Sequence, residues 1–267
     1  MSVISLSALD IGLASLMLVA LAITSICMSL GLEKKIIIFS CRMVGQLLLI
    51  GLVLRFLFSN ANGFLVFLMS LVMLFAAGRE VQARQKRKVV GLAGYLIGTG
   101  TMFISSFAVA GITLTIIIGV DPWYTPQYAI PLLGMLLGNT MTGIALSVDN
   151  LTSRYYDQRN TIEQRLMLGQ SWQEASADIR RDSMRTGMMP IINSMAAAGL
   201  VSLPGMMTGQ ILGGTPPVEA VKYQILIMLL IAAGTGFGVI GAIWMTSRHL
   251  FDDRHRLRLD CLSAKQQ

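Results

Sequence analysis

One adjacent pair of methionines and two asparagines lie in long apolar stretches, where few other side chains could do chemistry. The thioethers of Met206-Met207 can bind soft metal ions, although methionine more often fills gaps in apolar packing. The amides of Asn139 and Asn193 can hydrogen-bond between helices or line a polar path. The sequence leaves both interpretations open for both kinds of residue.

No pattern in the chain supports catalysis. The three cysteines are widely separated and match neither a disulfide framework nor a C-x-x-C metal site. Both histidines, His249 and His255, lie near the C-terminus. Walker A, zinc-protease and serine-hydrolase motifs are absent from the sequence. We therefore expect no enzyme activity and no cofactor in this chain, and the sequence assigns no metal ligand.

The composition places these residues in a lipid bilayer. Of the 267 residues, 54% are hydrophobic and 13% are charged, and the mean hydropathy is +0.66. A soluble domain carries about 25% charged residues, so soluble enzymes, disordered proteins and nucleic-acid-binding modules are excluded. A membrane-crossing helix needs about 20 mainly apolar residues. The sequence predicts seven such helices, at residues 11–32, 36–57, 63–77, 89–120, 130–148, 188–214 and 223–247.

The basic residues predict the orientation of these helices. All but two of the 21 Lys and Arg residues, Arg55 and Lys222, fall on one side of the predicted arrangement. Cytoplasmic loops are enriched in Lys and Arg. We therefore expect an all-α, multi-pass protein of the cell membrane, with its N-terminus outside and its C-terminus in the cytoplasm.

The sixth predicted helix contains a Pro204-Gly205 step. Proline donates no backbone hydrogen bond, which leaves the carbonyl of Leu200 without its helical partner. Unpaired carbonyls at membrane depth are tolerated only where protein or a water-filled cavity satisfies them. This helix is therefore a candidate for lining a pathway, and a packed proline kink is the equal alternative.

The longest polar segment, residues 150–187, is predicted to be cytoplasmic. Leu168, Trp172, Ala175 and Ile179 follow one another at helical spacing, and Gly169 suits a turn between two short helices. One interpretation is an amphipathic helix lying on the membrane surface. The other is a coupling helix that sits in a groove of a cytoplasmic partner.

Polar residues in this segment predict its local structure. Ser171 and Glu174 have the spacing of a capping box at a helix N-terminus. Asp178 and Asp182 each precede an arginine by three residues, so we expect two ion pairs along one helix.

Several stretches resemble the iron-export ABC permease family of the FetB type, which includes plant permeases linked to aluminium tolerance. The resemblance covers nearly the whole chain and is densest from about residue 130 to residue 227. It is carried by Gly134, Gly138-Asn139, Leu168-Gly169, Ala175, Arg181-Asp182-Ser183, Arg185, the run Gly-Leu-Val-Ser-Leu-Pro-Gly-Met-Met at 199–207, Ala220 and Lys222-Tyr223-Gln224-Ile225.

The resemblance implies a single permease domain, residues 1–267, working as a homodimer with two separate ABC ATPase subunits that hold Mg-ATP. Docking to the ATPase then becomes the favoured role of residues 150–187. Gln170 and Trp172 depart from the family pattern within this docking segment. The residues assigned to coupling are Glu163, Leu168, Gly169, Trp172, Ala175, Arg181 and Arg185.

The implied cargo is iron or another metal, exported across the membrane, which in a bacterium would be the inner membrane. The alternatives are an ABC permease for another substrate such as a nucleotide sugar, a secondary transporter that needs no ATPase, and a scaffold that transports nothing. The residues expected to line the pathway are Asn139, Asn193, Pro204, Gly205, Met206 and Met207.

Overall fold

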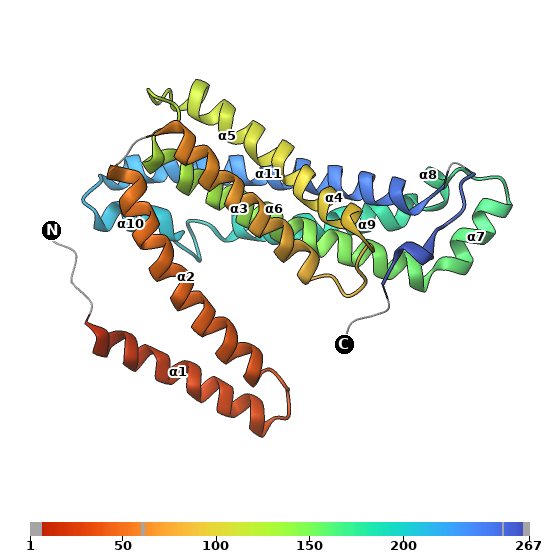
Figure 1. Ribbon diagram of the computed structural model, residues 1–267, viewed down its shortest axis with the longest axis horizontal. Helices are drawn as coiled ribbons and strands as arrows, with labels where there is room; N and C mark the ends of the chain where they lie inside the picture. The colour runs from red at the N-terminus through yellow and green to blue at the C-terminus, as the bar shows by residue number, and fades with distance from the viewer. Residues whose placement is uncertain (1–6, 60–61, 253, 264–267) are drawn as a thin grey trace.

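The computed structural model describes residues 7–59, 62–252 and 254–263, and these residues form helices joined by short turns (Figure 1). The all-α prediction is confirmed. The long helices are α1 (Ala8–Cys27), α2 (Glu33–Ser59), α3 (Gly63–Ala83), α6 (Pro126–Asp157), α9 (Ala177–Ala197) and α11 (Pro217–Leu250). The shorter ones are α4 (Leu92–Met102), η1 (Phe103–Phe107), α5 (Ala108–Ile112), η2 (Thr113–Ile117), α7 (Arg159–Met167), α8 (Trp172–Ala175), α10 (Gly205–Leu212) and η3 (Leu259–Cys261).

Six helices among the described residues are long and apolar enough to cross a membrane: α1, α2, α3, the continuous run Leu92–Ile117, α6 and α11. The predicted crossing at 188–214 is interrupted, as the Pro204-Gly205 step indicated, and the count of seven is not confirmed. α9 ends at Ala197 and α10 begins at Gly205. Gly199 adopts a left-handed backbone with φ +86°, and Pro204 then starts α10 from an extended conformation. A left-handed residue cannot continue a right-handed helix.

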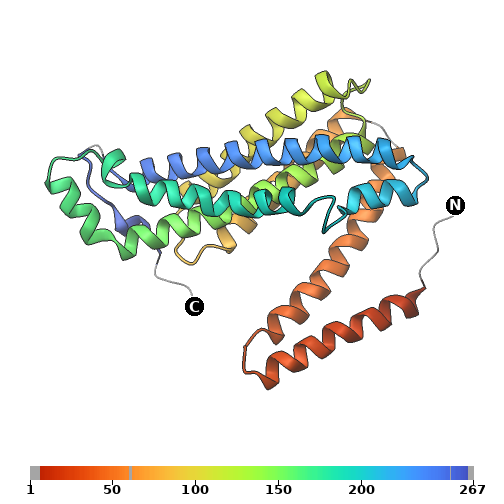
Figure 2. The same cartoon turned by 180° about the vertical axis from the view of Figure 1, so that it is seen from behind.

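The interrupted pair α9–α10 nevertheless follows the same course as the long helices beside it. α6 runs toward the end of the molecule that carries α7 and α8, α9 and α10 return, and α11 runs out again (Figures 1 and 2). α9 packs against both α6 and α11, and α10 packs against α11. The chain therefore covers the length of the bundle with a helix of 21 residues and a short one of 8 residues instead of a single helix.

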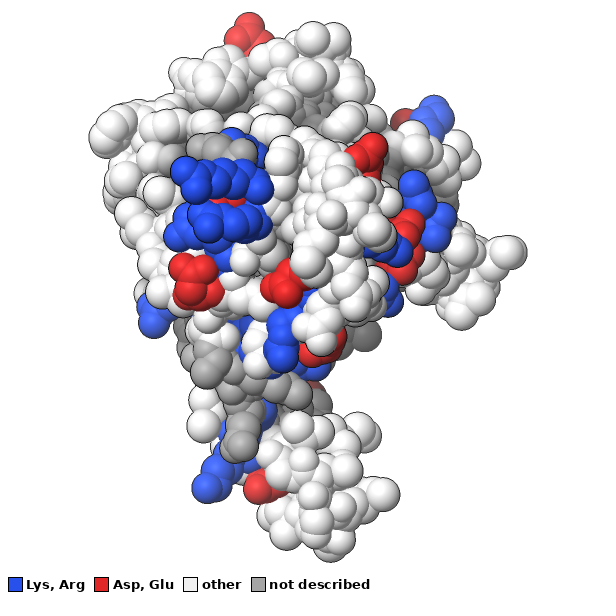
Figure 3. Space-filling view, turned by 90° about the vertical axis from the view of Figure 1, so that its right-hand side faces the viewer, with Lys and Arg blue, Asp and Glu red and all other residues white. Residues whose placement is uncertain are grey.

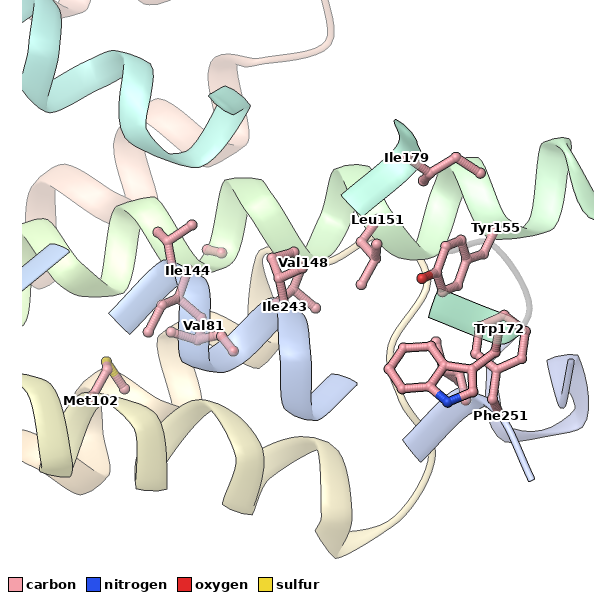
Figure 4. Close-up of a cluster of buried hydrophobic side chains, with 14 of the residues drawn as sticks. Val81, Met102, Ile144, Val148, Leu151, Tyr155, Trp172, Ile179, Ile243 and Phe251 are labelled. Atoms are coloured by element: carbon pink, nitrogen blue, oxygen red, sulfur yellow. The ribbon is translucent and has the colours of Figure 1, made fainter. Parts of the chain in front are cut away.

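Side chains from α3, α4, α6, α8, α9 and α11 form a continuous apolar core (Figure 4). It extends from Met102 and Ile144, both fully buried, through Leu151 and Tyr155 to Trp172. The hydroxyl of Tyr155 is satisfied by the hydroxyl of Ser247, 3.0 Å away. This core is the rigid frame that holds α9 and the segment before it.

α6 and α9 approach each other closely at two glycines. A Cβ atom on Gly187 would lie 2.6 Å from the carbonyl oxygen of Gly143 and 2.6 Å from the Cβ of Ser147. No real Cβ makes contacts that short, so only glycine fits at this crossing.

The α1–α2 hairpin stands away from this bundle (Figures 1 and 2). Leu57, near the end of α2, is the buried residue of that helix. Arg42 in α2 pairs with the carboxylate of Glu80 in α3. This ion pair links the α1–α2 hairpin to the helix that follows it.

Charged side chains gather at the end of the molecule that carries α7, α8 and the C-terminal residues, which we call the charged end (Figure 3). Several of them contact one another or aromatic rings there. Arg154 pairs with Asp182 at 2.8 Å, and the guanidinium carbon of Arg87 lies 3.5 Å from the ring centre of Tyr156. The rest of this surface is mostly uncharged, as expected for helices surrounded by lipid.

Candidate functional site

The break between α9 and α10 is held by its own backbone. The N–H of Gly199 donates to the carbonyl oxygen of Ser202 at 2.9 Å, and the N–H groups of Val201 and Ser202 both donate to the carbonyl oxygen of Ala197. The side chains around this turn are not packed, since Leu200 is 93% exposed and Val201 is 87% exposed. The break is therefore a formed turn whose apolar side chains contact little of their own chain.

Two pockets flank this break. The first, which we call the amide pocket, has a volume of about 530 Å³ and lies between α6, α9, α10 and α11. The second, the apolar pocket, has a volume of about 490 Å³ and lies between the break and α11. Pro204, Gln224 and Met228 line both pockets. The break is thus the wall that separates two cavities.

The amide pocket brings together most of the residues that the sequence predicted for a pathway. Asn139 of α6, Asn193 of α9 and Gly205 at the start of α10 all line it, together with Pro204 and Met206. Met207 does not join them, because it faces the apolar pocket on the other side of the break.

Gln224 of α11 also lines the amide pocket, and sequence reasoning did not single out its side chain. It is 8% exposed, and its Oε1 has no hydrogen-bond partner among the described residues. Its position in an apolar helix was a usable signal, because a polar side chain at membrane depth usually faces a cavity or the bundle interior.

Three methionines, Met135, Met206 and Met228, add thioethers to the pocket wall. All three also pack against the neighbouring hydrophobic cluster. Among the described residues that line the pocket there is no Asp, Glu, His or Cys. Over the described part of the chain, no three such residues come together as a potential metal site.

The predicted capping box is present at the charged end. The side chain of Ser171 accepts from the N–H of Glu174, and the carboxylate of Glu174 accepts from the N–H of Ser171 at 2.8 Å. That backbone hydrogen bond lowers the pKa of Glu174 below its usual value. The two predicted ion pairs also form, at 3.6 Å for Arg181 with Asp178 and 3.7 Å for Arg185 with Asp182.

The four residues expected on one helical face do not share it. α7 ends at Met167, and the chain reverses at Gly169, which has φ +88°. Leu168 is consequently 83% exposed at the tip of this turn, next to Met167, which is 80% exposed. Trp172, Ala175 and Ile179 instead point into the core.

Trp172 and Ala175 are buried, so neither presents a surface to a partner. The ring of Trp172 stacks on Phe251 with centroids 5.6 Å apart, and the guanidinium carbon of Arg180 lies 5.2 Å from its ring centre. The N–H of Trp172 donates to Nδ1 of His255 at 3.4 Å. A role of Trp172 and Ala175 in coupling would therefore be to position the segment. Glu163, Leu168, Gly169, Arg181 and Arg185 are the exposed residues of the predicted set.

Comparison with known proteins identifies the relatives of this chain. The family described as "Uncharacterised protein family (UPF0014)" matches residues 8–251. A protein of Escherichia coli named "Probable iron export permease protein FetB" is 35% identical over 96% of both chains. The protein "ALUMINUM SENSITIVE 3" of Arabidopsis thaliana is 31% identical over 94% of this chain and 90% of its own length.

A third relative, "UPF0014 membrane protein slr1647" of Synechocystis, is 36% identical over 85% of this chain and 87% of its own. No solved structure matches the chain. These matches cover most of the chain, and the six helices that are apolar enough to cross a membrane agree with the description of a relative as a membrane protein. The chain belongs to the UPF0014 family of multi-pass membrane proteins.

Proposed function

We propose that this chain is the membrane-spanning subunit of an ABC transporter that exports iron or another metal ion, with ATP hydrolysed by a separate subunit. The observation that carries the proposal is the relationship to the Escherichia coli protein named as an iron export permease, which extends over 96% of both chains. The arrangement of the charged end supports it, because that end offers a firmly held segment with an exposed apolar tip.

The tip formed by Met167 and Leu168 is the proposed contact with the ATPase. Two large apolar side chains exposed among charged residues are suited to a pocket on a partner. Behind the tip, the stacking of Trp172 on Phe251 and the ion pair of Arg154 with Asp182 tie the segment to the bundle. A push on the tip would therefore move α9 rather than bend a loose loop.

The exposed break supports a homodimer with the two breaks near its centre. Non-helical backbone at membrane depth must be covered by protein or face a water-filled cavity. Leu200 and Val201 contact little of their own chain, so a lone subunit would leave this turn in lipid. A second copy would cover it and would close the open side of the amide pocket.

The proposed orientation puts the charged end in the cytoplasm and the start of α1 on the opposite side of the membrane. α9 and α10 together would then provide a seventh, interrupted crossing. This orientation brings the basic residues to the side where Lys and Arg are retained, and it places the exposed tip where an ATPase with bound Mg-ATP is available.

The proposal is tested by ATP turnover of the reconstituted pair of subunits. Leu168→Asp puts a charge at the tip without disturbing a buried contact, so we expect the permease to fold and ATP turnover coupled to transport to fall at least about tenfold. Gln158→Asp, an exposed change at the other end of α7, is the control. Unchanged coupling in Leu168→Asp, or transport by the permease without any ATPase, would contradict the proposal.

A further inference from the structure

A groove of about 720 Å³ lies between α2, α3 and α6, and we call it the hairpin groove. The α1–α2 hairpin stands away from the bundle on this side (Figures 1 and 2). Phe39, Arg42 and Gln46 follow one another at helical spacing on α2 and line the groove. Within α2, which is described throughout, only Leu57 is buried. The hairpin therefore leaves space beside the bundle that its own side chains do not fill.

One end of the hairpin groove carries charge. Arg42 of α2, Glu80 in the last turn of α3 and Arg84, directly after that helix, all line it. Nη2 of Arg42 donates to Oε1 of Glu80, whereas the side chain of Arg84 forms no ion pair with any other described residue. The lining thus has one positive charge in excess. Because a guanidinium has five N–H donors, both arginines keep donors for a ligand.

The remainder of the hairpin groove is mainly apolar. Met73 and Ala77 of α3 form one wall, and Leu137 and Met141 of α6 form another. Gly138 leaves room between them, since a Cβ atom there would meet no atom within 4 Å. A positively charged end joined to an apolar slot matches an amphiphile that has an anionic head and a hydrocarbon chain.

The position of the charged end along α3 agrees with such a ligand. α3 is long and apolar enough to cross a membrane, and it ends at Ala83. The basic residues 86–88 follow it, as expected where a helix leaves the bilayer. Glu80 and Arg84 therefore lie near the level of the lipid headgroups, and Met73 lies at the depth of the acyl chains. Basic pockets between membrane helices at this level bind anionic headgroups, and arginine suits phosphate in particular.

We propose that the hairpin groove binds one anionic phospholipid. Its phosphate contacts the guanidinium groups of Arg84 and Arg42, and one of its acyl chains lies against Met73 and Leu137. The bound lipid fills the space between α2 and the bundle and supplies contacts that the side chains of α2 do not make. This site lies apart from the amide pocket, and binding there requires neither an ATPase nor a transported metal.

Native mass spectrometry of the full chain tests the inference. The chain is released from nanodiscs that hold equal amounts of phosphatidylglycerol and phosphatidylcholine with identical acyl chains. We expect one tightly retained lipid per chain, with phosphatidylglycerol favoured at least about fivefold, because each arginine near the headgroups attracts an anionic lipid by about that factor. Inorganic phosphate added in excess should not displace it, because the acyl chain contributes to binding.

Two variants separate the charge from the shape of the groove. Arg84→Gln should lower the preference for phosphatidylglycerol about fivefold. Its control is Arg79→Gln, which removes the same charge from an exposed position of α3 outside the groove. Gly138→Leu keeps every charge but fills the slot, and it should lower retention of phosphatidylglycerol at least about fivefold. Its control is Gly45→Leu on α2, where a Cβ atom also meets nothing within 4 Å and the groove is not lined.

Equal retention of the two lipids by the unchanged chain would overturn the inference. So would equal preferences in Arg84→Gln and Arg79→Gln, or full retention in Gly138→Leu. Displacement by inorganic phosphate would show an ion site without a lipid, and a groove covered by a second copy of the chain would retain neither lipid. Each of these results leaves the proposed transport function untouched, because they are measured without the ATPase.

Discussion

The two ends of α9 are built in opposite ways. At the charged end, the residues before α9 bury Trp172 and Ala175 and satisfy their own helix start through Ser171 and Glu174. At the other end, the chain leaves the helix at Gly199, and none of the residues of α10 is buried. One helix thus joins a firmly anchored segment to a loosely packed one.

This difference indicates how movement would pass through the subunit. An anchored segment transmits displacement, whereas a segment with few buried contacts is free to change its position at low cost. In the proposed transporter, closure of the ATPases would move α9 as a rigid rod, and the break with α10 would take up the movement beside the amide pocket. The predictions below test whether the two ends differ as described.

The largest expected effect is that of Trp172→Ala. Removing this buried ring takes away its stacking on Phe251 and leaves a cavity, which should destabilise the fold by about 3 to 5 kcal/mol. The control Leu168→Ala truncates an exposed side chain that makes no buried contact, and it should change stability by less than about 0.5 kcal/mol. Thermal unfolding in detergent, followed by circular dichroism, measures both. Similar melting temperatures would mean that the segment is not anchored.

A smaller loss is expected at the crossing of α6 and α9. Gly187→Ala forces a Cβ against the backbone of Gly143, and overpacking of this kind costs about 1 to 3 kcal/mol. Gly209→Ala in α10 meets no atom within 4 Å, so we expect no loss there and a gain of up to about 1 kcal/mol from helix propensity. A loss at Gly209 as large as that at Gly187 would show that α10 is packed after all.

The smallest effect is expected at the capping box. Ser171→Ala removes a side-chain acceptor at the start of α8 and should cost about 1 kcal/mol. Hydrogen bonding lowers the pKa of Glu174 in the folded state. The stabilisation that its carboxylate gives to the helix start is therefore fully present at pH values above the usual pKa of glutamate. This stabilisation is lost as the pH falls through the lowered value. The rate of proteolysis within residues 163–176 at neutral and acidic pH measures it, with Asn160→Ala as the control.

The sequence predicted what depends on neighbouring residues. The apolar runs predicted helices that can cross a membrane, and the spacing of Ser171 and Glu174 predicted the capping box. Asp178 and Asp182 each form the predicted ion pair with the arginine three residues later. The Pro204-Gly205 step correctly marked an interruption, although the helix already ends at Ala197 because Gly199 is left-handed.

The sequence could not predict contacts between distant segments. Gly143 and Gly187 have no spacing that relates them, yet they meet at the α6–α9 crossing. Trp172 looked like part of an exposed face because its partner Phe251 lies far along the chain. Gln224 is a polar residue in an apolar helix, and only the fold shows that it lines the same pocket as Asn139 and Asn193.

The pairing of Arg42 with Glu80 has a consequence for how the nascent protein enters the bilayer. The two residues are 38 positions apart and belong to different helices, so Arg42 is synthesised before the carboxylate of Glu80. An arginine at the centre of an inserting helix costs about 2.5 to 3.5 kcal/mol, and Arg42, the tenth of the 27 residues of α2, costs less than this. The strongly apolar flanks of α2 must offset this cost until α3 arrives, which makes the arrival of α3 the step that fixes the hairpin in place.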